Sequence, residues 1–345
     1  MNRRLFLSVW VLSMLNAYAK QNPHKRLKIL NYEDYFSKTT LSDYMLQTGI
    51  DISLETYGSD TEMTAKFLAS NPRYDLVFMS DLNVERYIRL GDLLSPLDKT
   101  LIPNISHIDK DFLTAEFDPS RRYSLPYFWG TLGIGYRKSA FKSVPSLKDL
   151  LDSDQHSGRI ALLADGATNI QMALKYLGFS LNTTKKEEIE QATELLKDQK
   201  KHIKTFAADN GQDLLKRGEV DIVLEWNGDM LQLIDESDDF AFVVPNEGTL
   251  LWEDCIVIPA RAAHIKEAHE FINYLYSEKT GILLAEYLQY ATPNATVKSK
   301  MPKSYLQNPA IFPSEETVKK CEKLKYTGAT VKAWYDQAWS DILSS

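Results

Sequence analysis

Short apolar runs alternate along this chain with segments whose apolar residues recur at helical spacing. Residues 27–30 and 50–55 have strand patterns, and residues 74–79 form a third, nearly continuous apolar run. Residues 63–68 carry the three- and four-residue spacing of a helix, which Pro72 ends. The pattern therefore predicts strands that alternate with helices, as in an α/β fold.

The same alternation restarts after Gly135. Further strands are expected at residues 160–163, 221–224, 240–244 and 250–259, and helices at residues 170–177, 186–196 and 265–287, the last with a break near Ser277.

Two of the apolar strands end in polar or aromatic residues. Residues 74–79 lead into Ser80 and Asp81, and residues 221–224 lead towards Trp226 and Asp229. Ligands of open α/β sheets bind at the carboxyl ends of strands, so two facing sheets would bring both sets to one ligand. The alternative is that each is an ordinary strand-to-helix junction, with Asp229 as a helix N-cap.

The first nineteen residues have the layout of a secretory signal peptide. Arg3 and Arg4 precede an apolar run over residues 5–15, and the segment from Asn16 to Ala19 supplies a small-residue cleavage site. We expect cleavage after Ala19 and a mature protein in the periplasm. The alternative is a buried N-terminal helix. The paired arginines resemble the twin-arginine export motif, so that route and the general secretory route both stay open.

Composition limits the classes of partner. Without residues 1–19 the chain keeps 38 basic and 47 acidic residues, because the removed segment holds two of the 40 basic residues and none of the acidic ones. A formal charge of −9 argues against nucleic acid, whose phosphates need a basic surface. The length suggests two lobes rather than one core. No second apolar run approaches the length of a membrane span.

Motifs for catalysis and metal binding are missing. The sequence holds no glycine-rich phosphate loop, no G-x-S-x-G elbow and no H-E-x-x-H motif. His264 and His269 lack zinc-ligand spacing. We therefore expect no catalytic residues, no metal and no cofactor. Cys255 and Cys321 are the only cysteines, and both a disulfide and two isolated thiols are compatible with their positions.

Five segments together carry a more specific signal: NYEDY at residues 31–35, YSLPYFWG at 123–130, WNG at 226–228, WED at 252–254 and YATPN at 290–294. In order and spacing they resemble the substrate-binding proteins of spermidine/putrescine ABC importers, from about Leu27 to the C-terminus. The resemblance implies the type II periplasmic-binding fold, with two α/β lobes and the ligand in the cleft between them. It implies a discontinuous lobe 1, over residues 20–131 and 255–311, and a lobe 2 over residues 132–254 and 312–345.

The resemblance also implies a ligand-binding set of aromatic, polar and acidic side chains: Tyr32, Tyr35, Ser80, Asp165, Thr168, Trp226, Asp229, Trp252, Asp254 and Tyr290. Thr168 stands where the family usually has a second acid. Asp229 stands at a position that is acidic in the putrescine-preferring branch only, so the preferred amine stays open. By strand alternation Glu225 and Glu253 should face away from the ligand. Tyr127 and Trp129 are interpreted as hinge or core residues.

The implied function is capture of a polyamine, spermidine or putrescine, and its delivery by a monomeric protein to an inner-membrane ABC permease. Carboxylates would bind the ammonium groups, and aromatic faces would pack the methylenes and attract the charges. One alternative is another organic cation or an amino acid on the same fold. A second is a thiamin-degrading transferase with a cysteine nucleophile, although Cys255 should point away from the face that carries Asp254.

Overall fold

The computed structural model describes residues 25–69, 73–208 and 210–345. The predicted signal peptide and its cleavage site lie outside these residues. In the described part, nine strands form one sheet system in the order β2-β1-β3-β9-β4-β7-β5-β6, with β8 also paired to β4. The strands are β1 (Arg26–Tyr32), β2 (Asp51–Tyr57), β3 (Leu76–Ser80), β4 (Ser124–Arg137), β5 (Ile160–Leu163), β6 (Ile203–Ala207), β7 (Ile222–Trp226), β8 (Phe240–Val243) and β9 (Leu251–Val257).

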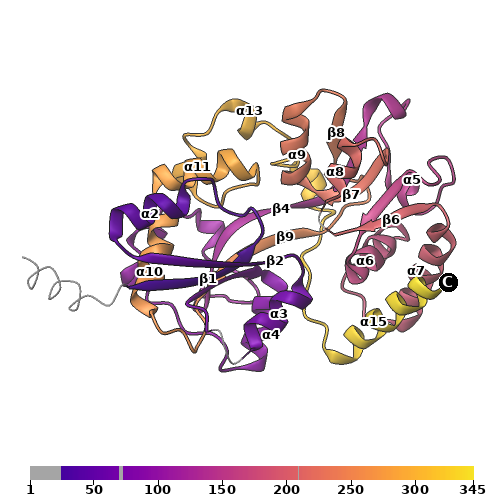
Figure 1. Ribbon diagram of the computed structural model, residues 1–345. Coiled ribbons are helices and arrows are strands. Elements are labelled where there is room, and N and C mark those ends of the chain that lie inside the picture. The colour runs from indigo at the N-terminus through magenta and orange to yellow at the C-terminus, as the bar shows by residue number, and fades with distance from the viewer. Residues whose placement is uncertain (1–24, 70–72, 209) are drawn as a thin grey trace, which may run out of the picture.

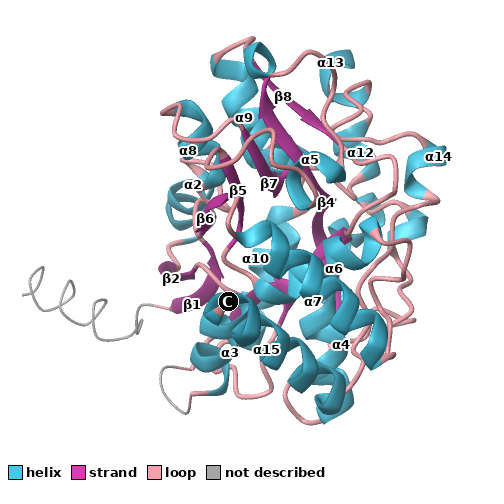
Figure 2. Ribbon diagram, turned by 90° about the vertical axis from the view of Figure 1, so that its right-hand side faces the viewer, coloured by secondary structure: helices cyan, strands magenta, loops and turns pink. Residues whose placement is uncertain are grey.

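Helices surround the strands in both halves of the molecule (Figures 1 and 2). None of the described helices is long and apolar enough to cross a membrane. The longer helices are α2 (Thr40–Thr48), α3 (Asp60–Leu68), α4 (Asp81–Leu90), α6 (Gly166–Tyr176), α7 (Lys186–Lys200), α9 (Asn227–Glu236), α10 (Ile265–Leu275), α11 (Glu278–Leu288) and α15 (Ala329–Ser344). The shorter ones are α5 (Leu147–Leu151), α8 (Gly211–Lys216), α12 (Ala295–Lys298), α13 (Lys303–Leu306) and α14 (Glu315–Val318).

The long strand β4 connects the two halves. Its residues from Ser124 to Thr131 pair with β9, whereas Leu132 to Tyr136 pair antiparallel with β7. We call the half built on β1, β2, β3 and β9 lobe 1, and the half built on β5, β6, β7 and β8 lobe 2. The predicted α/β class with two lobes is confirmed, while the residue numbers at which the lobes divide stay a prediction.

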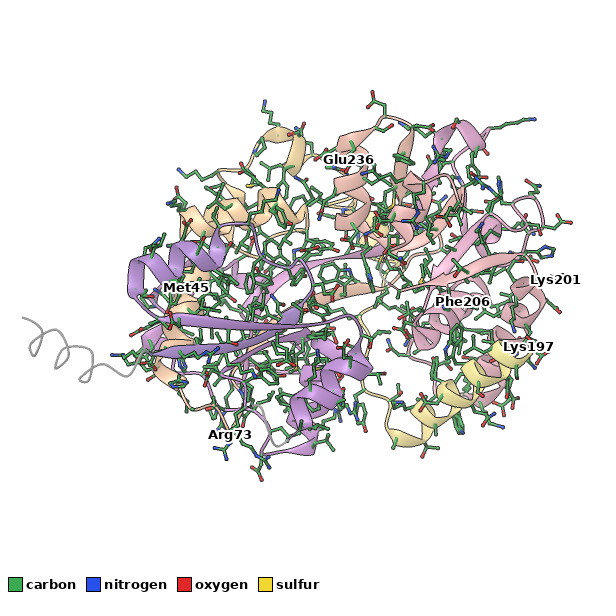
Figure 3. The ribbon with its side chains drawn as sticks, in the orientation of Figure 1. Met45, Arg73, Lys197, Lys201, Phe206 and Glu236 are labelled. Carbon is green, nitrogen blue, oxygen red and sulfur yellow. The ribbon has the colours of Figure 1, made fainter. Side chains whose placement is uncertain are left out.

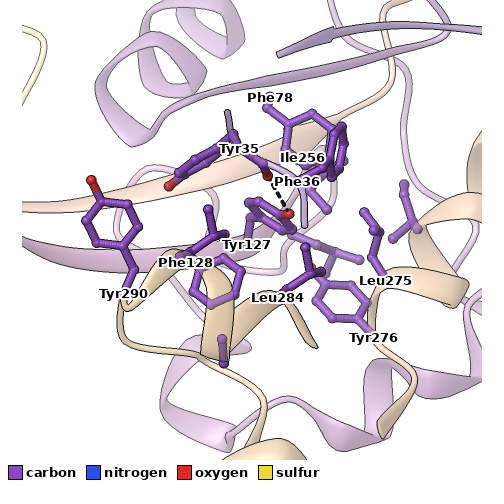
Figure 4. Close-up of a cluster of buried hydrophobic side chains, with 14 of the residues drawn as sticks. Tyr35, Phe36, Phe78, Tyr127, Phe128, Ile256, Leu275, Tyr276, Leu284 and Tyr290 are labelled. Atoms are coloured by element: carbon purple, nitrogen blue, oxygen red, sulfur yellow. Dashed lines mark hydrogen bonds between the residues drawn. The ribbon is translucent and has the colours of Figure 1, made fainter. Parts of the chain in front are cut away.

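Each lobe has its own apolar core. The largest cluster of lobe 1 extends from Leu27 to Ile311 and is rich in rings, such as Phe36, Phe78 and Tyr127 (Figure 4). Tyr127 donates a hydrogen bond of 3.0 Å to the carbonyl oxygen of Tyr35, so the loop that follows β1 is fixed to this core. The main cluster of lobe 2 includes residues of the C-terminal helix α15, which packs on α6 and α7.

A charged cluster lies on the opposite face of β9 from Asp254. Glu253 and Arg121 are each about 1% exposed in their side chains, and Nη2 of Arg121 lies 2.6 Å from Oε1 of Glu253. That contact is an ion pair without a well-aligned hydrogen bond. Lys323, from the segment that leads to α15, places its Nζ 2.9 Å from Oε2 of Glu253. Glu253 thus forms ion pairs with two cations that come from distant parts of the chain.

Replacement of Glu253 by methionine should lower the free energy of unfolding by about 3–5 kcal/mol, because it strands the buried guanidinium of Arg121. Urea unfolding followed by circular dichroism measures this loss. Glu190→Met is the matched control: Glu190 pairs with Lys186 on the exposed surface of α7, where ion pairs contribute little. Equal losses in the two variants would show that burial of the Arg121–Glu253 pair does not matter.

Candidate functional site

The predicted site residues come from strand ends that face the junction of the two lobes. Tyr32 is the last residue of β1, Ser80 the last of β3 and Trp226 the last of β7, while Asp165 follows β5 by two residues. The carboxyl ends of strands in facing α/β sheets converge in this way, because neighbouring strands stop at a common edge. Lys197 and Lys201 lie at the right-hand edge of the molecule, away from this junction (Figure 3).

Asp254 lies at the centre of the lobe 1 wall. Its Oδ1 accepts a hydrogen bond of 3.1 Å from the hydroxyl of Tyr32, and its Oδ2 accepts one of 2.5 Å from the hydroxyl of Tyr35. The residue is only 8% exposed. Burial raises the pKa of this carboxyl to about 7, although the two phenol hydrogen bonds lower the pKa and nearby Asp60 and Glu253 raise it further.

Aromatic rings continue the wall from Asp254 towards lobe 2. The ring of Tyr290 lies 6.0 Å from that of Tyr35 and 4.8 Å from that of Trp252, with edge-to-face geometry in both pairs. Trp252 in turn meets Trp226 of lobe 2 at 6.1 Å. Tyr290 also donates a hydrogen bond of 2.9 Å to Oδ2 of Asp229. The structure thus joins these predicted residues into one row of rings, with Asp254 at the Tyr35 end and Asp229 hydrogen-bonded to Tyr290 within the row.

The alternative role of Asp229 as an N-cap is wrong. Helix α9 begins at Asn227 and its N-cap is Trp226, so Asp229 is the third helical residue. Gly228 has to lack a side chain here, because a Cβ atom would overlap the ring of Tyr290. This close approach brings the hydroxyl of Tyr290 from lobe 1 within reach of Asp229 in lobe 2.

Asp165, Thr168 and Ser80 lie outside the row of rings. Asp165 is the N-cap of α6: its carboxylate accepts bonds from the backbone of Ala167 and Thr168 and from the hydroxyl of Thr168, the last at 2.8 Å. Thr168 is buried, whereas Asp165 is exposed. Ser80 accepts a bond of 3.0 Å from the amide of Asn83 and is paired in register with Asp254 across β3 and β9. All three have local structural partners.

The model of a family described as bacterial extracellular solute-binding proteins matches residues 39–313 of this chain. The chain belongs to this family.

Similar proteins agree with that assignment. The spermidine/putrescine-binding periplasmic protein of Escherichia coli K12 is 32% identical over 329 residues, which cover 94% of each chain. The putrescine-binding periplasmic protein PotF of the same strain is 26% identical over 340 residues, or 93% of this chain and 92% of PotF. A solved structure, the putative spermidine/putrescine ABC transporter from Listeria monocytogenes, superposes with a TM-score of 0.87 at 28% identity and covers 92% of this chain and 99% of its own.

Two acids outside the ligand-binding set that the resemblance implies, Asp60 and Asp81, are the first residues of α3 and α4. The negative charge of Asp60 raises the pKa of Asp254 and of the Tyr32 hydroxyl. Asp81 follows Ser80 and is 4% exposed; burial raises its pKa to about 8, an effect that Lys323 opposes. The signal for Asp60 was its place after the strand at 50–55, which has the same form as the strand ends that were selected.

The remaining predictions about orientation are also answered. Glu253 faces the charged cluster and Tyr127 the core, as expected. Cys255 and Cys321 are both free thiols. Cys255 is fully buried beside Glu253, and burial raises its thiol pKa well above the usual range, so it is unsuited to act as a nucleophile. The described residues contain no cluster of three His, Cys, Asp or Glu side chains that could hold a metal ion.

The raised pKa of Asp254 makes stability depend on pH. An acid whose pKa is higher in the folded state than in the unfolded chain stabilises the fold below pH 4 and loses that contribution as the pH rises through about 7. Asp254→Asn should therefore gain stability relative to the parent protein between pH 4 and 7, by at most about 1.4 kcal/mol per pH unit.

Chemical unfolding at pH 4, 5.5, 7 and 8 tests this difference without any ligand. A constant difference in the free energy of unfolding across this range would contradict a folded-state pKa near 7.

Proposed function

We propose that this solute-binding protein captures a polyamine, spermidine or putrescine, in the periplasm and delivers it to an ABC permease. The observation that carries the proposal is Asp254, a carboxyl group held by two tyrosine hydroxyls at one end of a row of aromatic rings. The names of two similar proteins, a spermidine/putrescine-binding protein and a putrescine-binding protein, support the same ligand class.

The chemistry of a polyamine matches such a row. Each ammonium group is a compact charge with three N–H donors, and methylene chains separate the ammonium groups. The rings of Trp226, Trp252 and Tyr290 offer apolar faces for the methylenes, and a ring face attracts a cation by roughly 0.5–2 kcal/mol. A hydrogen bond from ammonium to a carboxylate at Asp254 or Asp229 adds about 1.5–3 kcal/mol.

Asp254 explains why a cation, rather than a neutral solute, fits the site. A carboxyl group with a pKa of about 7 is poorly stabilised as an anion by its present surroundings. An ammonium group beside Asp254 would supply the opposite charge. Binding would then lower the pKa of Asp254, so that the carboxyl group loses its proton. Binding of an ammonium group is therefore most favourable beside Asp254, whose negative charge the protein itself compensates incompletely.

We assign the protein a binding role without covalent chemistry, as a monomer whose lobes close on the ligand. Lobe closure is supported by Trp226 and Trp252, which approach each other from different lobes, and by the strands β4 and β9 at the junction between the lobes. Another organic cation or an amino acid is the second candidate cargo, because the same rings and acids suit it.

A thermal-shift screen of diamines, triamines, amino acids and thiamin tests the function directly. Spermidine or putrescine should raise the melting temperature in a concentration-dependent way, because a ligand that binds only the folded state stabilises it. A shift with amino acids but with neither polyamine would overturn the proposal.

Asp254→Asn should weaken polyamine binding by roughly 100-fold or more, because loss of one partner of a buried charge pair costs about 3–5 kcal/mol. Isothermal titration calorimetry with putrescine and spermidine measures the loss. Asp51→Asn is the matched control. Asp51 is an exposed acid at the first residue of β2, whereas the last residue of that strand, Tyr57, pairs with Tyr32 of the site. Similar affinities in both variants would remove Asp254 from the site.

Asp229→Asn tests the second carboxyl group of the row, which Tyr290 contacts. If Asp229 binds an ammonium group, this variant should also lose about tenfold or more in affinity, and more for one ligand length than for the other. Asp229 is the third residue of α9 rather than its N-cap, so the variant leaves the N-cap residue Trp226 unchanged. An Asp229→Asn protein that binds both amines like the parent would show that Asp229 only positions Tyr290.

Lobe closure predicts a smaller radius of gyration at saturating ligand, measured by small-angle X-ray scattering, together with a change in tryptophan fluorescence. Trp226 belongs to lobe 2 and Trp252 to lobe 1, and their rings are in contact. A movement of one lobe relative to the other should therefore change the surroundings of both rings. Unchanged scattering with saturated binding would contradict closure and leave binding itself intact.

A further inference from the structure

Residues 322–326, which we call the strap, run along the junction of the two lobes towards α15 (Figure 1). Lobe 2 holds the strap through Asn182, which lies in the connection between α6 and α7. The side chain of Asn182 donates a hydrogen bond of 2.9 Å to the carbonyl oxygen of Lys323 and accepts one of 2.8 Å from the backbone N–H of Lys325. Helix α15, which follows the strap, packs on α6 and α7. The strap should therefore move with lobe 2.

The strap also contacts lobe 1, at two points beyond its ion pair with Glu253. The backbone N–H of Tyr326 donates a hydrogen bond of 2.7 Å to Oε2 of Glu85. Glu85 belongs to α4, which packs on β3 and β9 of lobe 1. Nζ of Lys325 lies 2.8 Å from Oε1 of Glu116, in the segment before β4. Any movement of the two lobes relative to each other must therefore change the contacts of the strap with lobe 1.

The three contacts differ in strength and in their distance from the hinge. The side chains of Lys325 and Glu116 are 54% and 80% exposed, so their ion pair contributes little. Glu253 lies on β9, a strand at the junction of the lobes, where a hinge movement displaces atoms least. Glu85 is only 8% exposed, and a hydrogen bond to a shielded carboxylate is one of the stronger kinds. The bond from Tyr326 to Glu85 is thus the costliest one to break when the lobes separate.

The strap makes this bond in an arrangement whose lobes touch. The rings of Trp226 and Trp252 meet across the junction at 6.1 Å, and the hydroxyl of Tyr290 in lobe 1 donates a hydrogen bond to Asp229 in lobe 2. The contact at Glu85 therefore belongs to the same arrangement as these contacts of the binding site, and it should stabilise that arrangement relative to one in which the lobes stand apart.

We propose that Glu85 raises the affinity for the polyamine from outside the row of rings, because its bond to the strap stabilises the closed arrangement of the lobes; this role rests on the proposed function. A ligand held between two lobes binds with an apparent affinity that falls in proportion to the population of the closed arrangement. Loss of the Glu85 carboxylate lowers that population. It should therefore weaken the binding of every ligand of the cleft by the same factor, whatever the ligand's length.

A role of Glu85 within α4 alone can be separated from its role at the strap. Arg89, four residues further along α4, donates hydrogen bonds of 3.0 and 2.6 Å to Oε1 of Glu85, whereas Tyr326 uses Oε2. The side chain of Arg89 is 60% exposed, so this ion pair contributes little. Arg89→Ala removes the partner within the helix and leaves the bond to the strap in place, which makes it the matched control.

Isothermal titration calorimetry with spermidine and putrescine on Glu85→Ala tests this role. The affinity for both amines should fall by the same factor, about threefold to tenfold, as expected for loss of roughly one charged hydrogen bond, while the number of binding sites stays at that of the parent. Arg89→Ala should bind both amines like the parent. Small-angle X-ray scattering without ligand should give a larger radius of gyration for Glu85→Ala than for Arg89→Ala.

Four results would overturn this role of Glu85. They are parent-like affinity in a folded Glu85→Ala protein, a loss for one amine only, fewer binding sites at unchanged affinity, and equal losses in Glu85→Ala and Arg89→Ala. The third result would show that Glu85 only supports the fold, and the fourth would assign the effect to α4 rather than to the strap. A parent protein that binds neither amine would instead refute the proposed function, and the radii of gyration would still test the strap.

Discussion

A carboxyl group shielded from water is unstable as an anion unless a charge or several donors compensate it, and this constraint shapes the site around Asp254. Two tyrosine hydroxyls supply part of the compensation, and the pKa near 7 shows that they do not supply all of it. A bound cation can compensate the rest of the negative charge on Asp254. The neighbouring rings shield the carboxyl group from water, so its negative charge stays poorly solvated. The same rings offer apolar faces that suit methylene groups.

Strand β9 separates two opposite uses of charge by simple alternation. Trp252 and Asp254 face the aromatic row, whereas Glu253 and Cys255 face the buried cluster of Arg121 and Lys323. Behind the strand the carboxylate of Glu253 is paired with two cations, whereas in front of it the carboxyl group of Asp254 is held by two tyrosine hydroxyls. The ion pairs of Glu253 therefore hold β9 in position, and this keeps Asp254 in place on the opposite face of the strand.

Strands with continuous apolar runs could be predicted from the sequence. β5 lies exactly where its pattern indicated, and the predicted break near Ser277 separates α10 from α11. Strand β4 was recognised only as a motif, because Pro126 and three glycines obscure its pattern, and its register shifts between Pro126 and Phe128. The row of rings was foreseeable from the family resemblance, whereas the hydrogen bond from Tyr290 to Asp229 was not, because it depends on how closely the two lobes approach each other.

The sheet order also has a consequence for how the chain reaches this structure. β9 lies between β3 and β4, and its pairing of Val257 with Val77 joins residues 180 positions apart (257 minus 77). Lobe 1 therefore cannot complete its sheet until nearly three quarters of the chain has been synthesised. Closing such long loops first is entropically costly, and folds dominated by distant contacts form slowly. A newly made chain would thus spend an extended time with the edges of β3 and β4 unpaired. During this period the chain is incompletely folded, and its exposed strand edges make it vulnerable to aggregation.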